Sequence, residues 1–195
     1  MVRWDETGGS VADDDVHWVP VAGLRLDSAI SPGDLLLIDL WAKLEQPGSV
    51  FYDITWTGFC GAVPPPEMTR VFGIVAAARD AAVARVQRAA AAAEDLRGYE
   101  VDDAARGVIR AAGLGDYFFH RTGHSIGEEV HGNGANMDNY ETHDERKVLP
   151  RTCFSVEPGI YLPAFGIRSE VNVYRDETSA EVTGEKQERL LELMA

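Results

Sequence analysis

The sequence predicts an α+β fold with a central antiparallel sheet and flanking helices. Two pairs of apolar, β-prone segments, each pair separated by a turn rich in Pro and Gly, predict two antiparallel hairpins. Between the two pairs lies a long segment in which apolar side chains recur at helical spacing. Two hairpins with helices between them place the chain in the α+β class.

The composition limits the kind of protein. The chain has 195 residues, 45% of them hydrophobic, which is enough to bury a sizeable core as one domain. Its formal net charge of −14 argues against general affinity for nucleic acid or anionic membrane surfaces. The 2 cysteines show no Cys-x-x-Cys spacing, which argues against a disulfide framework and a zinc knuckle. No apolar run could cross a bilayer and no signal-peptide core is visible, so we expect a reduced, cytoplasmic protein.

The N-terminal residues 1–15 are polar, acidic and without an apolar period, so we expect a loose arm. The segment His17–Pro20 predicts a short extended piece, because a proline disfavours helix at the residue before it.

The first hairpin is centred on a turn signal at Glu45–Gly48. The apolar run Leu35–Trp41 before it predicts a buried strand, and Val50–Trp56 after it predicts the returning strand. Asp39 and Asp53 lie symmetrically about the middle of this turn. We therefore expect their two carboxylates to face each other.

Two helices are predicted next. Apolar residues spaced as on one helix face run from Met68 to Val86 after three prolines, and the alanine-rich segment 89–93 extends that helix. We interpret it as a support helix, not a binding element, that is broken by Gly98. A second helix carries the apolar residues of 101–112 and ends at a Gly-Leu-Gly sequence.

A glycine-punctuated loop then places three histidines close together, at His120, His124 and His131. A lone histidine is more often a structural residue than a ligand. Three of them between glycines, which permit close backbone approach, favour a functional site. For His120 we favour a structural hydrogen-bonding role. For His131 the alternative is a loop histidine that faces water.

The second hairpin is predicted from the β-prone runs Cys153–Val156 and Val171–Tyr174 around a turn signal at Pro163–Gly166. Folding at that turn brings Glu157 and Glu170 to nearly facing positions. Burying two carboxylates is costly unless a cation lies between them or one stays protonated. The alternative is a pair of solvent-facing glutamates on an edge hairpin.

The C-terminal part follows a turn at Arg175–Ser179. We expect a short strand at Ala180–Thr183 and a closing helix at Glu185–Met194.

Carboxylates from both hairpins and one imidazole of the loop form a potential metal-binding set: Asp39, Asp53, His124, Glu157 and Glu170. One facing pair of carboxylates would be a coincidence, whereas two pairs in one chain indicate a shared site. Hard oxygen ligands with a single nitrogen suit Mn²⁺, Co²⁺, Fe²⁺ or Zn²⁺ in a two-metal centre with bridging carboxylates.

The segments around these residues resemble the creatinase and methionine-aminopeptidase superfamily, which has the pita-bread fold. The likeness is greatest to proline-specific peptidases of the Xaa-Pro dipeptidase and aminopeptidase type. The resemblance covers the chain from about His17 to Val173. Its motifs occur in the family's order: Leu37-Ile38-Asp39, Tyr52-Asp53-Ile54-Thr55, Thr122-Gly123-His124-Ser125-Ile126-Gly127, Val156-Glu157-Pro158-Gly159-Ile160-Tyr161 and Ile167-Arg168-Ser169-Glu170.

The resemblance implies two divalent ions, Mn²⁺ or Co²⁺ with Zn²⁺ or Fe²⁺ as alternatives, held by the five residues named above. It implies that Glu157 is also the general acid/base and that His131 contacts the substrate near the scissile amide. Arg168 matches an arginine that pairs with acidic groups around the substrate site. His17 matches a histidine that lines the substrate pocket, a match supported only by its His-Trp-x-Pro sequence.

The activity implied by the resemblance is hydrolysis of the N-terminal peptide bond of short peptides, often with proline after that bond. A creatinase-like reaction on a C–N bond of a small molecule would keep the fold and change the substrate. A non-catalytic, truncated relative that retains its motifs is an alternative of a different class.

The largest departure from the family is at the N-terminus, where the helices and strand that normally precede His17 have no counterpart. We therefore expect residues 16–195 to form an N-terminally truncated, metallopeptidase-like catalytic domain. The first hairpin would then expose an apolar surface, which we expect to be covered by self-association into a homo-oligomer. A smaller departure is Leu40-Trp41 after Asp39, where many relatives have glycine.

Overall fold

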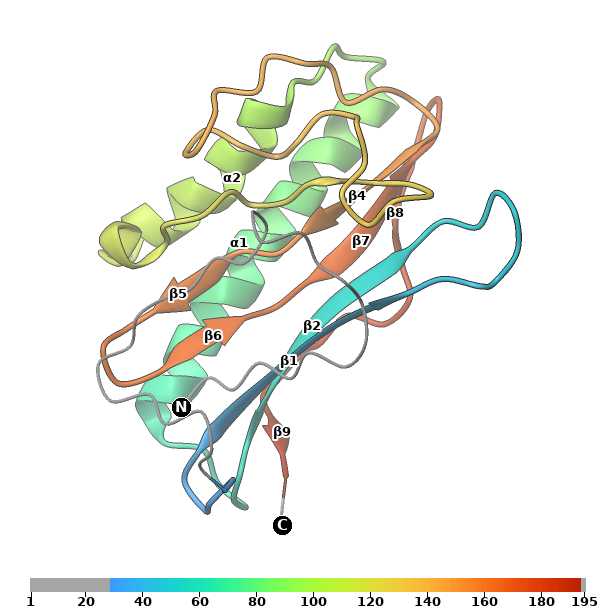
Figure 1. Cartoon of the computed structure of the whole chain (residues 1–195). Coiled ribbons are helices and arrows are strands. Elements are labelled where there is room, and N and C mark those ends of the chain that lie inside the picture. The colour runs from blue at the N-terminus through green and yellow to red at the C-terminus, as the bar shows by residue number, and fades with distance from the viewer. Residues whose placement is uncertain (1–28, 194–195) are drawn as a thin grey trace.

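The computed structural model describes residues 29–193 and is drawn in Figure 1. The predicted arm at 1–15 and His17 lie outside the described residues. Along the chain, the two helices lie between the first hairpin and the region of the second hairpin. Their bounds are β1 Leu35–Ala42, β2 Tyr52–Phe59, α1 Pro66–Ala91, α2 Gly98–Ala111, the 3₁₀ turn η2 Gly115–Tyr117, β3 Ser125–Ile126, β4 Thr152–Val156, β5 Gly159–Tyr161, β6 Gly166–Arg168, β7 Val171–Arg175, β8 Ala180–Thr183 and β9 Leu191–Glu192.

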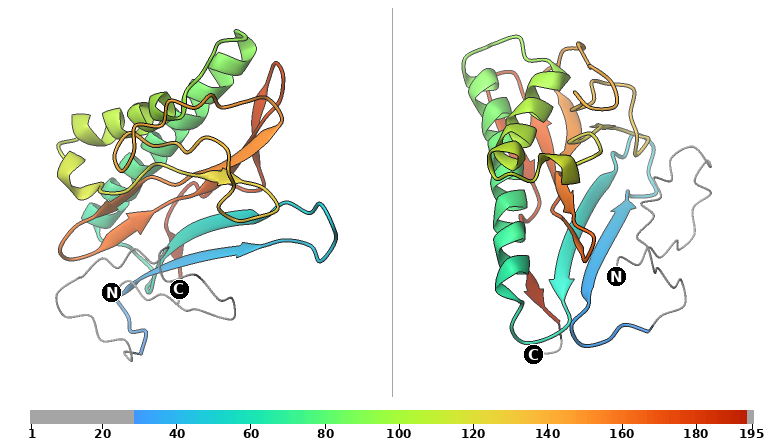
Figure 2. Two further views of the ribbon diagram at one scale, coloured as in Figure 1. Left: turned by 45° about the horizontal axis from the view of Figure 1, so that its top comes forward. Right: turned by 90° about the vertical axis from the view of Figure 1, so that its left-hand side faces the viewer.

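The described elements lie in layers (Figure 2). Helix α1 packs against the second hairpin region, in contact with β4 to β8, and α2 packs on α1. The hairpin of β1 and β2 lies on the opposite side of that region, where β2 contacts β6 and β7. Apolar side chains of α1 and the second hairpin fill the core, including Val75, Ala82, Phe154 and Val173. Two hairpin layers therefore face each other, and the predicted site residues come from both.

The first hairpin is present, but its register differs from the prediction. Asp39 lies opposite Thr55, and Asp53 lies opposite Trp41. The hairpin is thus centred on Pro47, one residue beyond the assumed centre, so the two aspartates do not face each other. Because the shift between them is two residues, both side chains still lie on the same face of the pair.

The strand predicted as buried over Leu35–Trp41 is only half buried. Leu35 and Leu37 are in the core, whereas Ile38 is 49% and Leu40 50% exposed. β1 is the edge strand of the β1-β2-β9 sheet, and only its inner face is covered, by β6. The prediction of a strand buried on both faces is wrong for this reason.

Helix α1 ends before Gly98, so the prediction that Gly98 breaks it is wrong. The helix ends in a Schellman motif in which Ala93 has φ of 51°, Ala93 N–H binds the Ala90 carbonyl and Glu94 N–H binds the Ala89 carbonyl. Gly98 instead begins α2. A Cβ at this position would collide with the carbonyl oxygen of Asn136, which explains the glycine.

The second hairpin has the predicted register. Val156 pairs with Val171 in the β4–β7 ladder, and Gly159 pairs with Arg168 in the β5–β6 ladder. Both ladders share one register, so Glu157 and Glu170 take facing positions in the break between them. In this break the two residues are not part of either ladder, and their backbone N–H groups bind other segments instead, Glu157 the Thr122 carbonyl and Glu170 the Thr55 carbonyl.

The C-terminal helix predicted at Glu185–Met194 is not formed. Within the described part of this segment, β9 pairs in parallel with Gly58 and Phe59 of β2. Gln187 is buried and binds the backbone of Thr57. These tertiary contacts override the helical propensity of a charged sequence. The predicted strand at Ala180–Thr183 is present as β8.

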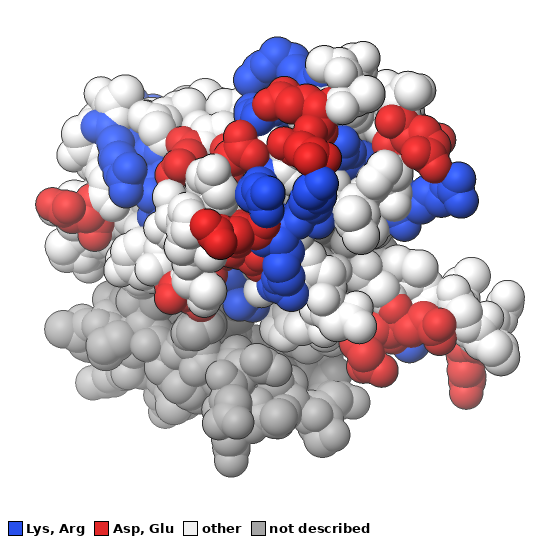
Figure 3. All heavy atoms as spheres, turned by 90° about the horizontal axis from the view of Figure 1, so that it is seen from above, with Lys and Arg blue, Asp and Glu red and all other residues white. Residues whose placement is uncertain are grey.

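The surface seen from above the view of Figure 1 carries basic and acidic side chains side by side (Figure 3). Surface ion pairs such as Lys147–Asp95 at 2.6 Å and Arg85–Glu94 at 2.8 Å fit this pattern. The acidic side chains therefore do not form a continuous negative patch on this face. Among the residues described, no helix is long and apolar enough to span a membrane.

Candidate metal centre

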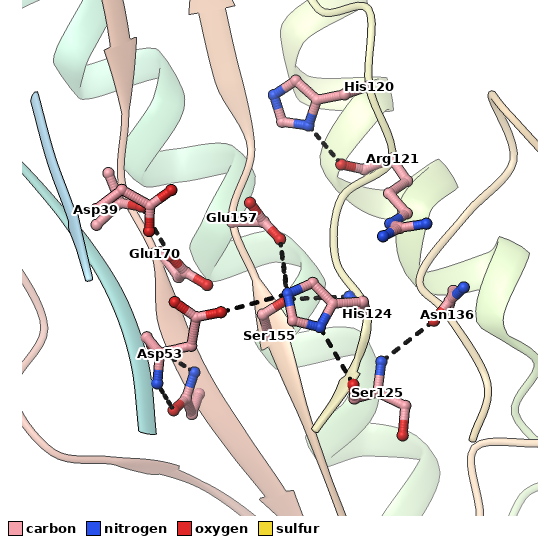
Figure 4. A network of polar contacts seen from close by, with 12 residues as sticks. Asp39, Asp53, His120, Arg121, His124, Ser125, Asn136, Ser155, Glu157 and Glu170 are labelled. Atoms are coloured by element: carbon pink, nitrogen blue, oxygen red, sulfur yellow. Dashed lines mark hydrogen bonds and ion pairs between the residues drawn. The ribbon is translucent and has the colours of Figure 1, made fainter. Parts of the chain in front are cut away.

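The five predicted metal ligands lie around one region between the two hairpin layers (Figure 4). Asp39 and Asp53 belong to β1 and β2. Glu157 follows β4, and Glu170 precedes β7. His124 stands directly before β3, on the loop that follows α2. Segments far apart in the sequence thus bring four carboxylates and one imidazole together.

His124 is oriented by its neighbours. Its Nδ1 lies 3.2 Å from the carbonyl oxygen of Ser125, which can only accept, so Nδ1 carries the proton. Its Nε2 points at the carboxylates, 3.4 Å from Oδ2 of Asp53 and 3.5 Å from Oε1 of Glu157. A histidine that donates from one nitrogen and turns the other toward carboxylates has the arrangement of a metal ligand.

Asp53, His124 and Glu170 each offer one ligand atom, and these atoms lie within 4.8 Å of one another. All three residues are buried. Within the described chain, Oδ1 of Asp53 and Oε1 of Glu170 are buried without a hydrogen-bond partner. Buried carboxylate oxygens are costly to leave unpaired, and a divalent cation would satisfy them. The donor set therefore fits a divalent metal ion.

Asp39 and Glu157 share a basic neighbour. Arg168 forms an ion pair with Asp39 through Nη2, and its Nη1 lies 3.6 Å from Oε2 of Glu157. The other oxygen of Glu157 accepts a hydrogen bond from the Ser155 hydroxyl at 3.0 Å. The structure thus places the predicted Arg168 between two predicted metal ligands.

The site raises the pKa of several of its acids. Burial, followed by repulsion from Glu157 and Asp53 and opposed by Arg168, raises the pKa of Asp39 to about 6. Burial and the same kind of repulsion raise the pKa of Glu170 well above its ordinary value. Both shifts favour the neutral, protonated carboxyl, because the positive charge of Arg168 does not offset the burial of the ionised form; a bound cation would supply further positive charge.

Neighbours of opposite charge shift the pKa of two other groups of the site, Glu157 and His124. Burial opposes ionisation of Glu157, but Arg168 and the histidines outweigh burial and lower its pKa. For His124, burial favours the neutral form, but Asp53 and Glu157 outweigh it and raise its pKa. Without a cation, the centre therefore favours a proton on His124 beside an ionised Glu157.

The remaining predicted histidines differ in position. The His131 ring lies edge-on to His124, with ring centroids 4.3 Å apart, so it borders the carboxylate cluster. His120 donates or accepts at Nε2 with the Tyr161 hydroxyl at 2.9 Å, and burial lowers its pKa to about 4. That contact agrees with the structural role predicted for His120. His17 lies outside the described residues.

Sequence reasoning missed the residues that hold the ligands in place. The Thr55 hydroxyl donates to Oε2 of Glu170 at 2.7 Å, and the Ser155 hydroxyl accepts from the His124 backbone N–H at 2.9 Å. The carboxamide of Asn172 binds the backbone of Asp53. A usable signal was the polar series at 53, 55 and 57, which alternates along β2 and is buried throughout.

A second missed group links the His124 loop to α2. Asp102 of α2 accepts from the backbone N–H of Thr122 at 3.0 Å and from its hydroxyl at 2.6 Å. The buried Arg106 binds both oxygens of Asp102 and the carbonyl of Phe118. Thr122 in turn accepts a hydrogen bond from the Glu157 backbone N–H at 2.7 Å. Helix α2, for which the sequence predicted no role, thus supports the loop that carries His124.

The chain is similar in sequence to a known family of proteins. The model of metallopeptidase family M24 matches residues 7–177. An Xaa-Pro dipeptidase of Pyrococcus furiosus is 33% identical over 170 residues, which are 87% of this chain and 45% of that protein. An Xaa-Pro dipeptidase of Lactobacillus delbrueckii is 35% identical over 144 residues, 73% of this chain and 35% of that protein. The chain thus spans less than half the length of these curated relatives.

Solved structures show the same likeness. The crystal structure of dipeptidase PepE from Mycobacterium ulcerans superposes with a TM-score of 0.74 at 32% identity, covering 86% of this chain and 42% of that one. A dipeptidase from Pyrococcus horikoshii gives a TM-score of 0.72 at 30% identity, with 85% and 43% covered. These neighbours have the pita-bread fold of mixed sheets and helices, and their family is metal-dependent. The chain belongs to metallopeptidase family M24.

Proposed function

We propose that this chain carries the metal centre of a hydrolase that cleaves the N-terminal peptide bond of short peptides, as an Xaa-Pro dipeptidase or aminopeptidase does. The observation that carries the proposal is the buried cluster in which His124 Nε2 lies 3.4 Å from Oδ2 of Asp53, while Oδ1 of Asp53 and Oε1 of Glu170 are buried without a hydrogen-bond partner among the described residues. The two curated relatives described above, named Xaa-Pro dipeptidases, support the choice of substrate.

Two divalent cations, Mn²⁺ or Co²⁺ first and Zn²⁺ or Fe²⁺ as alternatives, are proposed to be held by the carboxylates of both hairpins and by the loop histidine. Such cations polarise a scissile carbonyl and lower the pKa of an attacking water. The mixed set of oxygen ligands with one imidazole suits these ions better than a thiolate-binding metal. The proposed ligands are Asp39, Asp53, His124, Glu157 and Glu170.

Glu157 is proposed to be the general acid/base that takes a proton from water and returns it to the leaving amine. Both of its oxygens are oriented, one by the Ser155 hydroxyl at 3.0 Å and the other by Arg168 at 3.6 Å. Its lowered pKa favours the ionised form that accepts a proton first. A fixed carboxylate with its base form available is suited to this transfer.

His131 and Arg168 are proposed to contact the substrate. His131 borders His124 and is in reach of a carbonyl bound there, where it would stabilise the tetrahedral intermediate. Arg168, buried and held by Asp39 and Thr55, offers a fixed positive charge beside the site. His17 is proposed to line the pocket as well.

The test combines metal analysis with an assay. We expect the chain reconstituted with Mn²⁺ or Co²⁺ to bind about two ions and to hydrolyse a dipeptide with proline second. Glu157→Gln keeps the shape but cannot exchange the proton, so kcat should fall by about 10²-fold or more with a smaller change in KM. Glu177→Gln, at an exposed glutamate paired with Arg151, is the matched control.

Other outcomes would support the alternatives. Metal binding with hydrolysis of a C–N bond in a small creatine-like molecule, but not of dipeptides, would favour a creatinase-like function. Metal content near zero after reconstitution would favour a non-catalytic relative. His131→Ala should keep the metals and lower kcat/KM, and loss of metal in that variant would contradict the role given to His131.

A further inference from the structure

The inner edge of β2 is held by side chains where a sheet would use a neighbouring strand. On its other edge β2 pairs with β1 over its whole length. On the inner edge, the paired strand β9 reaches only Gly58 and Phe59. From Asp53 to Thr57 this edge faces the second hairpin, where the described residues form no backbone ladder with it. Its buried N–H and C=O groups need other partners.

Asn172 of β7 supplies those partners at Asp53. Its Oδ1 accepts from the Asp53 N–H at 2.9 Å, and its Nδ2 donates to the Asp53 carbonyl at 2.6 Å. One carboxamide thus makes the two hydrogen bonds that an opposing strand residue would make. Asn172 is 1% exposed, so water does not compete for these contacts.

Gln187 makes the same pair of bonds four residues along the strand. Its Oε1 accepts from the Thr57 N–H at 3.0 Å, and its Nε2 donates to the Thr57 carbonyl at 2.6 Å. Gln187 is 2% exposed. The two amides therefore have the same chemistry and burial on one strand, but only Asn172 holds a residue of the candidate metal centre.

Asn172 also links two ligands of that centre. It lies on β7 two residues after Glu170, and β7 is fixed on both sides by pairing with β4 and β8. The Glu170 N–H in turn donates to the Thr55 carbonyl at 3.1 Å. The backbones that carry Asp53 and Glu170 are thus tied to each other directly, beside the gap into which both side chains point (Figure 4).

We propose that Asn172 is a positioning residue of the metal centre: its carboxamide fixes the backbone of Asp53 and so sets where that carboxylate meets His124 and Glu170. The inference rests on the proposed metal site. Residues that orient metal ligands typically change metal affinity by about 10–100-fold when they are replaced. Gln187, by contrast, holds the backbone of Thr57, which is not a proposed metal ligand, so its role is structural alone.

The experiment compares matched variants by isothermal titration with Mn²⁺ and by the visible absorption spectrum of the Co²⁺-loaded protein. Asn172→Leu and Gln187→Met each remove one buried carboxamide at nearly constant volume. Both should lower the melting temperature of the metal-free protein to a similar extent. Asn172→Leu should weaken Mn²⁺ binding by about 10–100-fold and alter the Co²⁺ spectrum, while Gln187→Met should retain both.

Asn172→Asp keeps the acceptor for the Asp53 N–H but loses the donor to the Asp53 carbonyl. This variant replaces Asn172→Leu in the experiment if the leucine variant does not fold. Its added negative charge should attract cations, so weaker Mn²⁺ binding in this variant also supports positioning. Wild-type Mn²⁺ affinity in a folded Asn172 variant would overturn the inference alone, as would equal losses in Asn172→Leu and Gln187→Met. Absence of Mn²⁺ and Co²⁺ binding by the wild-type chain would overturn the proposed function together with it.

Discussion

The imidazole of His124 is prepared for a cation by a single backbone contact. Because the Ser125 carbonyl takes the Nδ1 proton, the lone pair of Nε2 turns toward Asp53 and Glu157. When no cation is bound, protons serve the same electrostatic purpose. Burial raises the pKa of Asp39 to about 6 and that of Glu170 well above its ordinary value.

These shifts fix the sign of a pH dependence. The folded, metal-free chain binds the Asp39 proton more tightly than the unfolded chain does, so this contribution to stability is lost as the pH rises through about 6. The raised pKa of His124 acts in the same direction. Glu157, with a lowered pKa, acts in the opposite direction, and its contribution is lost only toward acid pH.

Cations must displace the protons on Asp39, Glu170 and His124. We therefore expect the Kd for Mn²⁺ to fall by about tenfold or more between pH 5 and pH 7.5, since each released proton contributes up to a factor of ten per pH unit. Isothermal titration in two buffers of different ionisation enthalpy would count the protons released. A Kd that stays constant over this range would contradict the site described above.

At the scale of elements, α2 holds the His124 loop through a buried ion pair. Asp102 binds Arg106 on the same helix and receives both hydrogen bonds of Thr122. Behind the loop, a Cβ at Gly123 would collide with the carbonyl oxygen of Ser155, so the loop and β4 are in direct backbone contact. The helix therefore sets the position of the loop.

Removing the Thr122 hydroxyl tests this support. Thr122→Val keeps the shape and leaves the buried Asp102 with one donor fewer, so the free energy of unfolding should fall by about 1–3 kcal/mol. Thr122→Ser retains the hydroxyl and should lose less. Denaturant unfolding of both variants would measure the difference. Equal losses would show that the methyl group contributes as much as the hydroxyl, and no loss in Thr122→Val would contradict the support described here.

The end of α1 offers a stabilising substitution. Ala93 adopts φ of 51° at an exposed position, a left-handed conformation that glycine takes without steric cost. Ala93→Gly should raise the free energy of unfolding by about 0.5–1 kcal/mol. Ala91→Gly, inside the last turn of the helix, is the control and should lower it by a similar amount. A loss of stability in Ala93→Gly would contradict the Schellman geometry.

The elements differ in how far the sequence predicts them. Alternating and apolar patterns with turn signals were enough for both hairpins and both helices. The predicted centre of the first hairpin was one residue too early, which shifted the pairing register by two residues, because the centre of a four-residue turn cannot be read from composition. The conformation of the segment Glu185–Leu193 is set by contacts of Gln187 and β9 with β2. No local sequence pattern reveals these contacts. The roles of Asn172 and Asp102 likewise depend on pairing over long sequence distances.

For the candidate site, the five residue types were identified together, since hairpins and a glycine-rich loop bring carboxylates and a histidine into one region. The structure brings Asp53, His124 and Glu170 into the tightest group and ties Asp39 to Arg168. This division depends on side-chain rotamers and burial. Neither is encoded in the spacing of the motifs.

At the scale of the whole molecule, the described residues form layers in which β1 is the outermost strand. Its inner face contacts the second hairpin, while its outer face is exposed. The hairpin turn that follows β1 also carries exposed apolar side chains, since Leu44 is 69% and Val50 51% exposed. Exposed apolar side chains that gather on one surface mark interaction sites in soluble proteins.

We therefore expect the chain to self-associate through β1. Light scattering at tens of micromolar should give a mass above that of a single chain, and the melting temperature should rise with protein concentration. The double variant Ile38→Thr/Leu40→Thr keeps β propensity and removes apolar area from the exposed face, so it should shift the mass toward one chain with little loss of folded structure. The matched double variant Leu35→Thr/Leu37→Thr, on the buried face of the same strand, should instead unfold the protein. A single-chain mass for the wild type at every concentration, with a constant melting temperature, would contradict association through this strand.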